Sequence, residues 1–229
     1  MKKIHLLLLV LAMVGCQGAA LTGLVLFKGT EVPPKFDDLL KGEKRVAVVS
    51  RAVYSNAYEL QNAPREIARQ VSVLLNDNIR HATRLNHRNN KLHVVEQSKV
   101  EAWLDDRNND FESFSEVGRD KSIGADIVIG IDIVGFQIRH PQNASLIQGR
   151  CHVQVQAVEC ATGKILASDK LMIVDPPSMP IPNNPELEPQ FRAQFIRVVS
   201  TRIATLFHYY DKNKRDRIDA DNLEMHRIN

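Results

Sequence analysis

A run of β-branched residues near the middle of the chain constrains the fold more than any other part of the sequence. Residues 125–138 read ADIVIGIDIVGFQI. Successive side chains of a strand point to opposite faces. One face of this segment therefore carries four isoleucines, Ile127, Ile129, Ile131 and Ile133. The opposite face carries Val128, Gly130, Asp132 and Val134. We expect this segment to be a long central strand of a sheet.

The flanking segments predict further strands and the helices that cover the sheet. Strands are expected in the β-branched or alternating segments 45–50, 91–96, 149–159 and 165–174. Helices are expected where apolar residues recur every three or four positions, over 62–85, 98–106 and 190–210, with a less regular pattern over 114–123. The predicted order is β-α-β-α-β-β-β-α. This order indicates an α/β fold, an α+β sandwich with a mixed sheet and helices packed mainly on one face.

Local signals refine the boundaries of these elements. Ser98 is expected to be the N-cap of the second helix, with Glu101 three residues later completing a capping box. The CATGK turn places Gly163 for a positive φ, so the strands on either side of it should form a hairpin. In the first of these strands, the side chains that face inward are expected to be Cys151, Val153, Val155 and Ala157.

A loop with six prolines follows the hairpin, over residues 175–189. Proline cannot donate to a sheet ladder, so this loop cannot enter the centre of the sheet. It is expected to cross the surface or to mark a binding edge.

The N-terminus has the pattern of a secretory leader. Lys2 and Lys3 precede the apolar segment 4–14, which is followed by Gly15 and Cys16. A membrane-spanning helix needs about 20 apolar residues, so this segment alone is too short to span a bilayer.

The MVGC segment resembles the lipobox of bacterial lipoproteins, with Met13 at the position where Leu is usual. The resemblance implies that Cys16 is the lipid attachment site and becomes the first residue after cleavage. Gln17 lacks the Asp that resembles an inner-membrane retention signal. We therefore expect a lipid-anchored protein on the periplasmic side of the cell envelope, at the outer rather than the inner membrane.

Two alternatives to the lipid anchor remain open. Residues 18–27 are also uncharged, so residues 4–27 together are long enough for an uncleaved anchor with its lysines in the cytoplasm. A freely secreted form is the other alternative. In each case the body of the protein lies outside the cytoplasm.

The expected organisation has four parts. Residues 1–15 are the signal peptide, and residues 16–43 are the lipidated Cys and a tether that contains a Pro pair and several charges. Residues 44–210 are long enough for one α/β domain with its own core. Residues 211–229 form a charged C-terminal tail.

The charge balance gives no sign of a nucleic-acid partner. The chain has 30 Lys and Arg against 27 Asp and Glu, and the loss of Lys2 and Lys3 with the leader reduces this excess to one. A nucleic-acid surface would require a clustered basic patch.

Two cysteines remain besides Cys16. An oxidising compartment favours disulfides. However, Cys151 and Cys160 lie nine residues apart in one extended segment, about 30 Å at about 3.3 Å per residue, and bridged Cα atoms lie within about 7 Å. We expect no internal disulfide unless the chain bends between them, and Cys151 is expected to be a buried thiol.

The recurrent signatures of hydrolases, zinc enzymes and nucleotide-binding proteins are absent from the sequence. It contains no G-x-S-x-G, H-E-x-x-H, P-loop or C-x-x-C motif. His81, His87 and His93 are expected on solvated faces or loops rather than at a metal. Asp132 would be a candidate acid or base if both sheet faces were covered. With helices on one face, it should point to water or to a basic residue of a neighbouring strand. We expect no catalytic residue and no cofactor.

The tail after the last helix resembles a degenerate calcium loop. Asp211, Asn213 and Asp219 fall at positions 1, 3 and 9 of an EF-hand-like loop. Arg215 replaces the ligand at position 5 and Asn222 replaces the bidentate Glu. The loss of two ligands should prevent tight calcium binding, so a solvated tail without metal is expected.

The combined pattern resembles a known α/β domain. The lipobox, a VAVV first strand, a long first helix, the GADIVIGIDIVGF strand and the ECATGKILAS hairpin are the features that carry the resemblance. They look like the domain shared by curli-secretion-channel lipoproteins, the N-terminal domain of the Tol-Pal translocation protein and lipoprotein activators of peptidoglycan synthases. The resemblance covers residues 44–210 and depends mostly on the order of the elements.

These features predict a membrane-anchored, non-enzymatic binding or assembly module with an envelope protein as partner. An oligomer is compatible with them. The polar face of the sheet, its edge strands and the Pro-rich loop are the candidate surfaces. A subunit of a secretion or transport assembly is the alternative, although a lipid-facing barrel needs hairpins of about 10 residues per strand. An enzyme with an unrecognised site is a third possibility.

Overall fold

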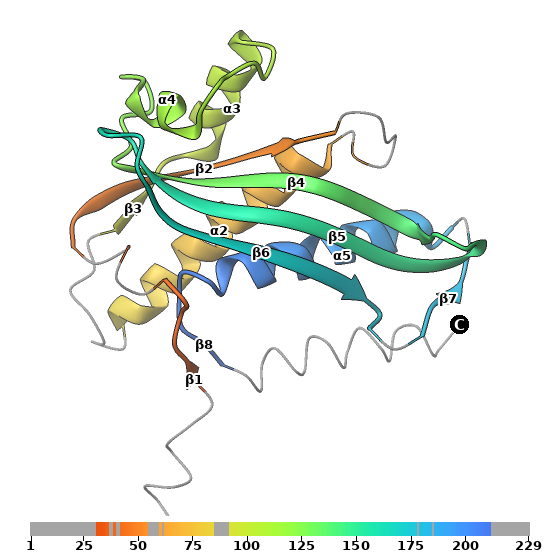
Figure 1. Cartoon of the computed structure of the whole chain (residues 1–229). Coiled ribbons are helices and arrows are strands. Elements are labelled where there is room, and N and C mark those ends of the chain that lie inside the picture. Colours follow the sequence, from red (N-terminus) through yellow and green to blue (C-terminus); the bar gives the residue numbers. More distant parts are fainter. Residues whose placement is uncertain are drawn as a thin grey trace, which may run out of the picture.

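The predicted central strand is β4 (Ile127–His140), which lies in the middle of the main sheet (Figure 1). The structure is a computed structural model. It describes residues 31–36, 39, 42–54, 60, 62–84, 92–177, 179–184 and 186–211. The helix predicted over residues 62–85 and the three other predicted helices are all present, so the chain has the mixed α/β architecture that the sequence predicts.

The main sheet has six strands and mixed pairing. Their order is β3-β2-β4-β5-β6, and β7 pairs with the N-terminal part of β5. β2 pairs in parallel with β3 and β4, whereas the β4–β5 and β5–β6 pairs are antiparallel. The bounds of these strands are β2 Lys44–Ala52, β3 Leu92–Val94, β5 Asn143–Glu159, β6 Ile165–Asp175 and β7 Ile181–Pro182.

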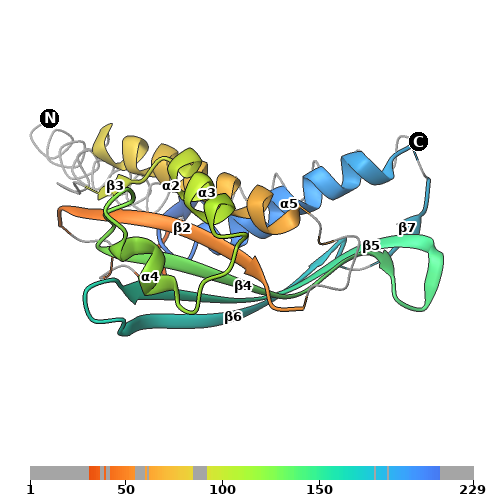
Figure 2. The ribbon, with the colours of Figure 1, turned by 90° about the horizontal axis from the view of Figure 1, so that it is seen from above.

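Two long helices cover one face of the sheet, and two short helices cover one end of the other face (Figures 1 and 2). α2 (Ala63–Arg84) and α5 (Glu188–Ala204) pack on the first face. α3 (Gln97–Asp106) and α4 (Phe114–Arg119) pack on the second. The helices therefore lie mainly, but not only, on one face. The rest of the second face, over β4, β5 and β6, is called the open face below.

The alternation of side chains divides the core into two clusters. In β2, Val46 and Val48 face α2 and α5, whereas Ala47 and Val49 face α3 and α4. All four are fully buried. The same period of two places the four isoleucines of β4 in the first cluster, as the sequence predicts. The four inward-facing residues predicted for β5 join them there.

A β-bulge in β4 reverses the alternation after Val134. Ile133 pairs with Val153, but the next pair joins Gly135 to His152, so Val134 is the extra residue. Phe136 consequently lies in the first cluster although its position is even. The alternation of residue types in the sequence gives no sign of this change.

Gly149 allows close packing between β5 and α5. A Cβ atom at this position would lie 2.6 Å from the ring of Phe195, which is fully buried. The absence of a side chain therefore sets how closely the helix approaches the strand.

The hairpin after β5 forms as predicted, with Gly163 at a φ of 73°. The Pro-rich loop stays at the periphery of the sheet. It begins with a cis peptide bond between Asp175 and Pro176, and Ile181 then pairs with Ile147 near the start of β5.

Two details of the predicted helices are wrong. α3 begins at Gln97 with Glu96 as its N-cap, and no side chain caps it. Ser98 is therefore inside the helix, and Glu101 forms an ion pair with Arg69 of α2 instead of completing a capping box. The last helix ends at Ala204 rather than at residue 210, and the chain then turns so that Phe207 is still buried.

Both cysteines of the domain are free and buried, and they lie in different clusters. Cys151 belongs to the first cluster and Cys160 to the second, so the sheet separates them. Burial raises the pKa of the Cys151 thiol to about 12 and that of the Cys160 thiol to about 11. Both groups are therefore neutral thiols near neutral pH.

Part of the segment expected to be a tether packs on the domain. β1 (Glu31–Val32) pairs antiparallel with β8 (Tyr210–Asp211), next to the end of α5. The backbone N–H of Phe36 donates to the Leu206 carbonyl at 2.9 Å. The ring centroids of Phe36 and Phe207 lie 5.5 Å apart.

Candidate binding surface

Asp132 is held in place by a basic residue of the neighbouring strand. In the β2–β4 register it lies beside Arg51, whose Nε donates to Asp132 Oδ1 at 2.7 Å. Gln156 Nε2 donates to the other carboxylate oxygen at 3.2 Å. This confirms the prediction that the carboxylate reaches a basic residue across the sheet. Because the Asp132 residue as a whole is only 9% exposed, the ion pair rather than solvent satisfies the charge of its carboxylate.

The Arg51 side chain is fixed by two aromatic rings that belong to the second cluster. Its guanidinium carbon lies 4.7 Å from the ring centroid of Phe114 and 5.1 Å from that of Phe111. A cation over aromatic faces is stabilised by the ring quadrupoles. Both charged groups of the pair are thus engaged within the fold, which favours a structural role over acid–base chemistry.

Beyond this ion pair, the open face carries cationic and apolar side chains. In the β-sheet register, His152 lies opposite Met172, and Gln154 lies opposite Lys170. Met172 is 72% exposed and Val134 is 41% exposed. Among the described residues of β4, β5 and β6, the acidic side chain on this face is that of Asp132, and it is already paired with Arg51. The open face is therefore amphipathic, with a positive bias.

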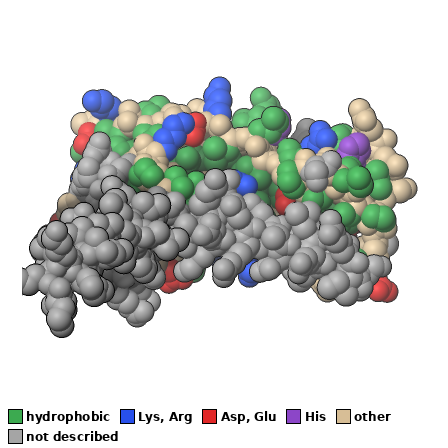
Figure 3. Space-filling model, turned by 90° about the horizontal axis from the view of Figure 1, so that it is seen from below, with side chains coloured by type: hydrophobic (Ala, Val, Ile, Leu, Met, Phe, Trp, Pro, Cys, Tyr) green, Lys and Arg blue, Asp and Glu red, His purple; other side chains and the backbone are tan. Residues whose placement is uncertain are grey.

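β6 is a long edge strand with a groove beside it. No strand pairs with the outer side of β6 in the part of the chain that the structure describes. A groove of about 440 Å³ runs between residues 171–175 and the C-terminal half of α5. Its walls are mostly apolar, with Leu171, Ile173, Val198 and Leu206 among them. In Figure 3, which views the molecule from the β6 side, hydrophobic side chains lie between Lys and Arg side chains.

An unpaired strand edge exposes backbone donors and acceptors that can pair with another extended chain. A groove next to such an edge can receive alternate side chains of the added segment. The β6 edge and its groove therefore have the features of a site for β-strand addition. The sequence indicated edge strands as candidate surfaces but did not identify which strand lies at the edge.

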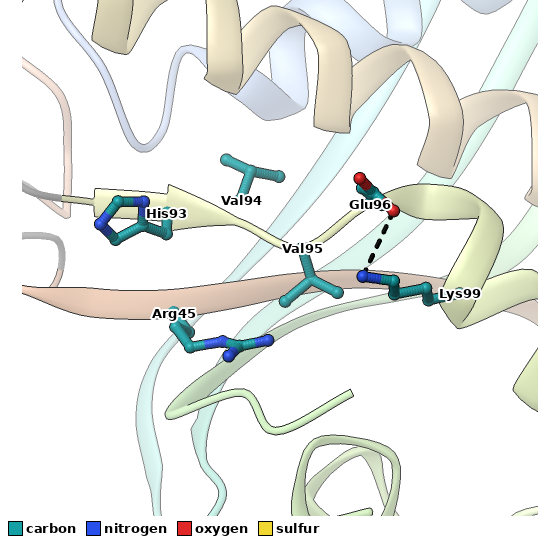
Figure 4. Close-up of a pocket in the computed structure, with 6 residues that line it drawn as sticks. All are labelled: Arg45, His93, Val94, Val95, Glu96 and Lys99. Atoms are coloured by element: carbon teal, nitrogen blue, oxygen red, sulfur yellow. Dashed lines mark ion pairs between the residues drawn. The ribbon is translucent and has the colours of Figure 1, made fainter. Parts of the chain in front are cut away.

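A second, smaller cavity lies at the opposite edge of the sheet (Figure 4). It has a volume of about 290 Å³ and is lined by β3, the start of α3 and Arg45. Lys99 forms an ion pair with Glu96 at 3.3 Å, and Arg45 donates to the carbonyl of Ile123 at 2.9 Å. His93 is exposed at its mouth, as expected for a solvated histidine. The charge of Lys99 is thus balanced by Glu96, and the side chain of Arg45 is held by a backbone carbonyl.

Several predicted site residues fall outside the described part of the chain. Cys16, Asn213 and Asp219 are among them, as is the side chain of His81. Asp211 lies in β8, where it pairs with Glu31. Among the described residues, no three His, Cys, Asp or Glu side chains are grouped to hold a metal ion.

None of the helices in the described ranges is both long and apolar enough to cross a membrane.

Comparisons with known proteins identify similar folds but no family. No family model matches the sequence, and no curated protein matches it. Among solved structures, the chain is similar to lipoprotein GNA1162 from Neisseria meningitidis, with 11% identity and a TM-score of 0.41 over 69% of this chain and 99% of that one. It is also similar to the PelC dodecamer protein from Paraburkholderia phytofirmans, with 10% identity and a TM-score of 0.38 over 78% and 95%. For the LpoB C-terminal domain from Salmonella enterica, the identity is 18% and the TM-score 0.31 over 60% and 87%. The similar structures thus include a bacterial lipoprotein.

Proposed function

We propose that this protein is a lipid-anchored binding module of the bacterial cell envelope, without enzymatic activity, that holds an extended segment of a partner protein. The lipobox-like sequence at Cys16 supports the anchor, and it favours the periplasmic side of the outer membrane. The edge of β6 supports the binding role.

The observation that carries the binding role is the combination of an 11-residue edge strand with an apolar groove. A partner strand added to β6 would extend the sheet through main-chain hydrogen bonds. Its alternate side chains would enter the groove between β6 and α5. The neighbouring Lys170 and the exposed Met172 would then contact the partner on the open-face side.

The anchor and the binding edge can be tested separately. Mass spectrometry of the protein purified from membranes should show an acylated Cys16 as its first residue, and Cys16→Ser should abolish the lipid mass. An unmodified N-terminus would contradict the anchor.

For the binding edge, a photo-crosslinking amino acid is placed at Met172 on β6 or at Val73 on α2, which is also exposed. The Met172 position should give a discrete crosslinked protein in cells, and the Val73 position should not. Substitution of Leu171 by Glu, which puts a charge at the groove, should weaken that crosslink. Equal crosslinking from both positions would contradict binding at β6.

A further inference from the structure

A row of polar side chains crosses the sheet and ends at the β6 edge (Figure 1). In the strand register, Arg51 of β2 lies beside Asp132 of β4. Asp132 lies opposite Gln154 of β5, which in turn lies opposite Lys170 of β6. Side chains at directly opposite positions share one face of the sheet and lie about 5 Å apart. The row therefore ends at the edge on the ammonium group of Lys170, which is exposed.

The charges of this row are balanced except at its end. Asp132 already pairs with Arg51 at 2.7 Å. None of the ion pairs within the described part of the chain involves Lys170. The two acidic residues of β6, Asp169 and Asp175, are an odd number of positions away from it, so they point to the helix-covered face instead. A strand added outside β6 would contribute the next residue of the row.

The neighbouring row ends at the same edge on an apolar side chain. Two positions along the strands, Gly135 lies opposite His152, and His152 lies opposite Met172. Met172 is 72% exposed, and a Cβ atom at Gly135 would meet nothing within 4 Å. The sheet surface is therefore open beside Met172. An apolar side chain on an added strand would remove the Met172 side chain from water.

The helix-covered side of the same edge is also apolar. Leu171 and Ile173 alternate with Lys170 and Met172 and line the groove of about 440 Å³, with Val198 on its opposite wall. Successive residues of an added strand would point alternately to the open face and into this groove. The residues that point into the groove must be apolar, because a charge there would lose its hydration.

Residues 35–36 limit how far an added strand can extend along β6. Lys35 forms an ion pair with Asp169 of β6 at 2.8 Å. The backbone N–H of Phe36 donates to the carbonyl of Leu206, which lines the groove. This segment therefore closes the groove at the end next to Asp169. The accessible part of the edge is residues 170–175, so the added strand is short.

We propose that the partner segment is a short antiparallel strand that places an Asp or Glu opposite Lys170 and an apolar residue opposite Met172, with an apolar residue between them in the groove. This inference deepens the proposed function and rests on it. Antiparallel pairing is favoured because it is slightly more stable per residue than parallel pairing. From its N-terminus, the partner strand would thus carry two apolar residues followed by the acidic one.

The acidic residue gives the site selectivity as well as binding energy. Opposite charges at facing positions attract, whereas a cation facing Lys170 would repel it. The carboxylate also fixes the register of the added strand. A slip of one residue would turn the carboxylate into the apolar groove and the neighbouring apolar residue to the position beside Lys170.

The test measures the binding of three labelled peptides to the full-length protein in detergent by fluorescence anisotropy. The peptides share one strand-forming sequence of Thr and Val with a single Phe. The residue two positions after the Phe is Glu, Gln or Lys. When the Phe lies opposite Met172 in an antiparallel strand, this variable residue lies opposite Lys170.

We expect the Glu peptide to bind about fivefold more tightly than the Lys peptide, with the Gln peptide between them. Lys170→Glu should reverse this order. Lys164→Glu is the matched control, because it makes the same charge change at an exposed position just before the other end of β6, and it should leave the order unchanged. Leu171→Gln should weaken the binding of all three peptides, because it places a polar group in the groove.

Three results would overturn the inference. The first is an order of affinities that Lys170→Glu leaves unchanged. The second is an order that Lys164→Glu alters as much as Lys170→Glu does, since this would show a response to net charge alone. The third is the absence of binding by all three peptides up to about 1 mM, the range of very weak complexes.

The photo-crosslink at Met172 separates failure of this inference from failure of the proposed function. If Met172 gives a discrete crosslinked protein but Lys170→Glu does not reverse the peptide order, the binding edge stands and only the inferred partner chemistry is wrong. If Met172 gives no crosslinked protein, the binding edge fails and this inference fails with it.

Discussion

Arg51 and Asp132 lie side by side on the parallel strands β2 and β4 and form an ion pair with a distance of 2.7 Å. The Asp132 side chain is 12% exposed and the Arg51 side chain is 35% exposed. The pair sits where the covered part of the second sheet face meets the open face, so it links the two regions.

Removal of one member of this pair should destabilise the fold. Asp132→Asn leaves Arg51 without its counter-charge in a mostly buried site, and we expect a loss of about 2 kcal/mol in the free energy of unfolding. Chemical denaturation measures this loss. The double variant Arg51→Met with Asp132→Leu should lose less free energy of unfolding than the sum of the losses in the single variants Arg51→Met and Asp132→Leu. Additive losses would show that the two residues do not interact.

The close approach of α5 to β5 at Gly149 should not tolerate a methyl group. Gly149→Ala would place a Cβ within 2.6 Å of the Phe195 ring, so we expect a loss of about 1–3 kcal/mol in the free energy of unfolding. Gly135→Ala is the matched control because nothing lies within 4 Å of its Cβ. Its effect should stay within about 0.5 kcal/mol. Equal losses for the two variants would contradict the packing described for Phe195.

The two domain cysteines should be unreactive in the folded protein. Burial raises the pKa of Cys151 to about 12 and that of Cys160 to about 11, so neither forms an appreciable thiolate at pH 8. A thiol reagent should therefore modify them slowly in native buffer and rapidly in urea. Fast native labelling of either residue would show that the sheet opens around it.

The stability of the protein should depend on the protonation of His208. Burial lowers the pKa of His208 below its usual value of 6.5 in the folded state. Below pH 6.5 the unfolded chain therefore binds more protons at this residue than the folded chain does. The stabilisation from neutral His208 is present above pH 6.5. It is lost as the pH falls from 6.5 through the lower pKa that His208 has in the folded state.

The measurement is the free energy of unfolding between pH 5 and pH 8, a range of about one to two units on each side of the ordinary histidine pKa. His208→Gln should show a smaller decrease toward pH 5 than the unsubstituted protein does. Identical slopes for the two proteins would contradict the burial of His208.

The sequence by itself determined the order of the elements and the faces of the main strands. The period of two in β4 assigned four isoleucines to one face, because adjacent strand residues must point in opposite directions. The CATGK turn identified the hairpin through Gly163, since only a residue that tolerates positive φ closes such a turn. The sequence also predicted that Asp132 would point to water or to a basic residue of a neighbouring strand, and the structure pairs it with Arg51. These inferences depend only on local backbone geometry.

The tertiary structure decided which distant residues meet. The bulge at Val134 depends on how β4 and β5 align, and the partner of Glu101 depends on how α2 packs beside α3. The pairing of β1 with β8 joins segments that lie at opposite ends of the domain in sequence. No local pattern specifies such contacts, because their stability comes from surfaces that the folded chain brings together. The position of β6 at the edge of the sheet and the packing of Phe36 against the end of α5 could be located only after those contacts were known.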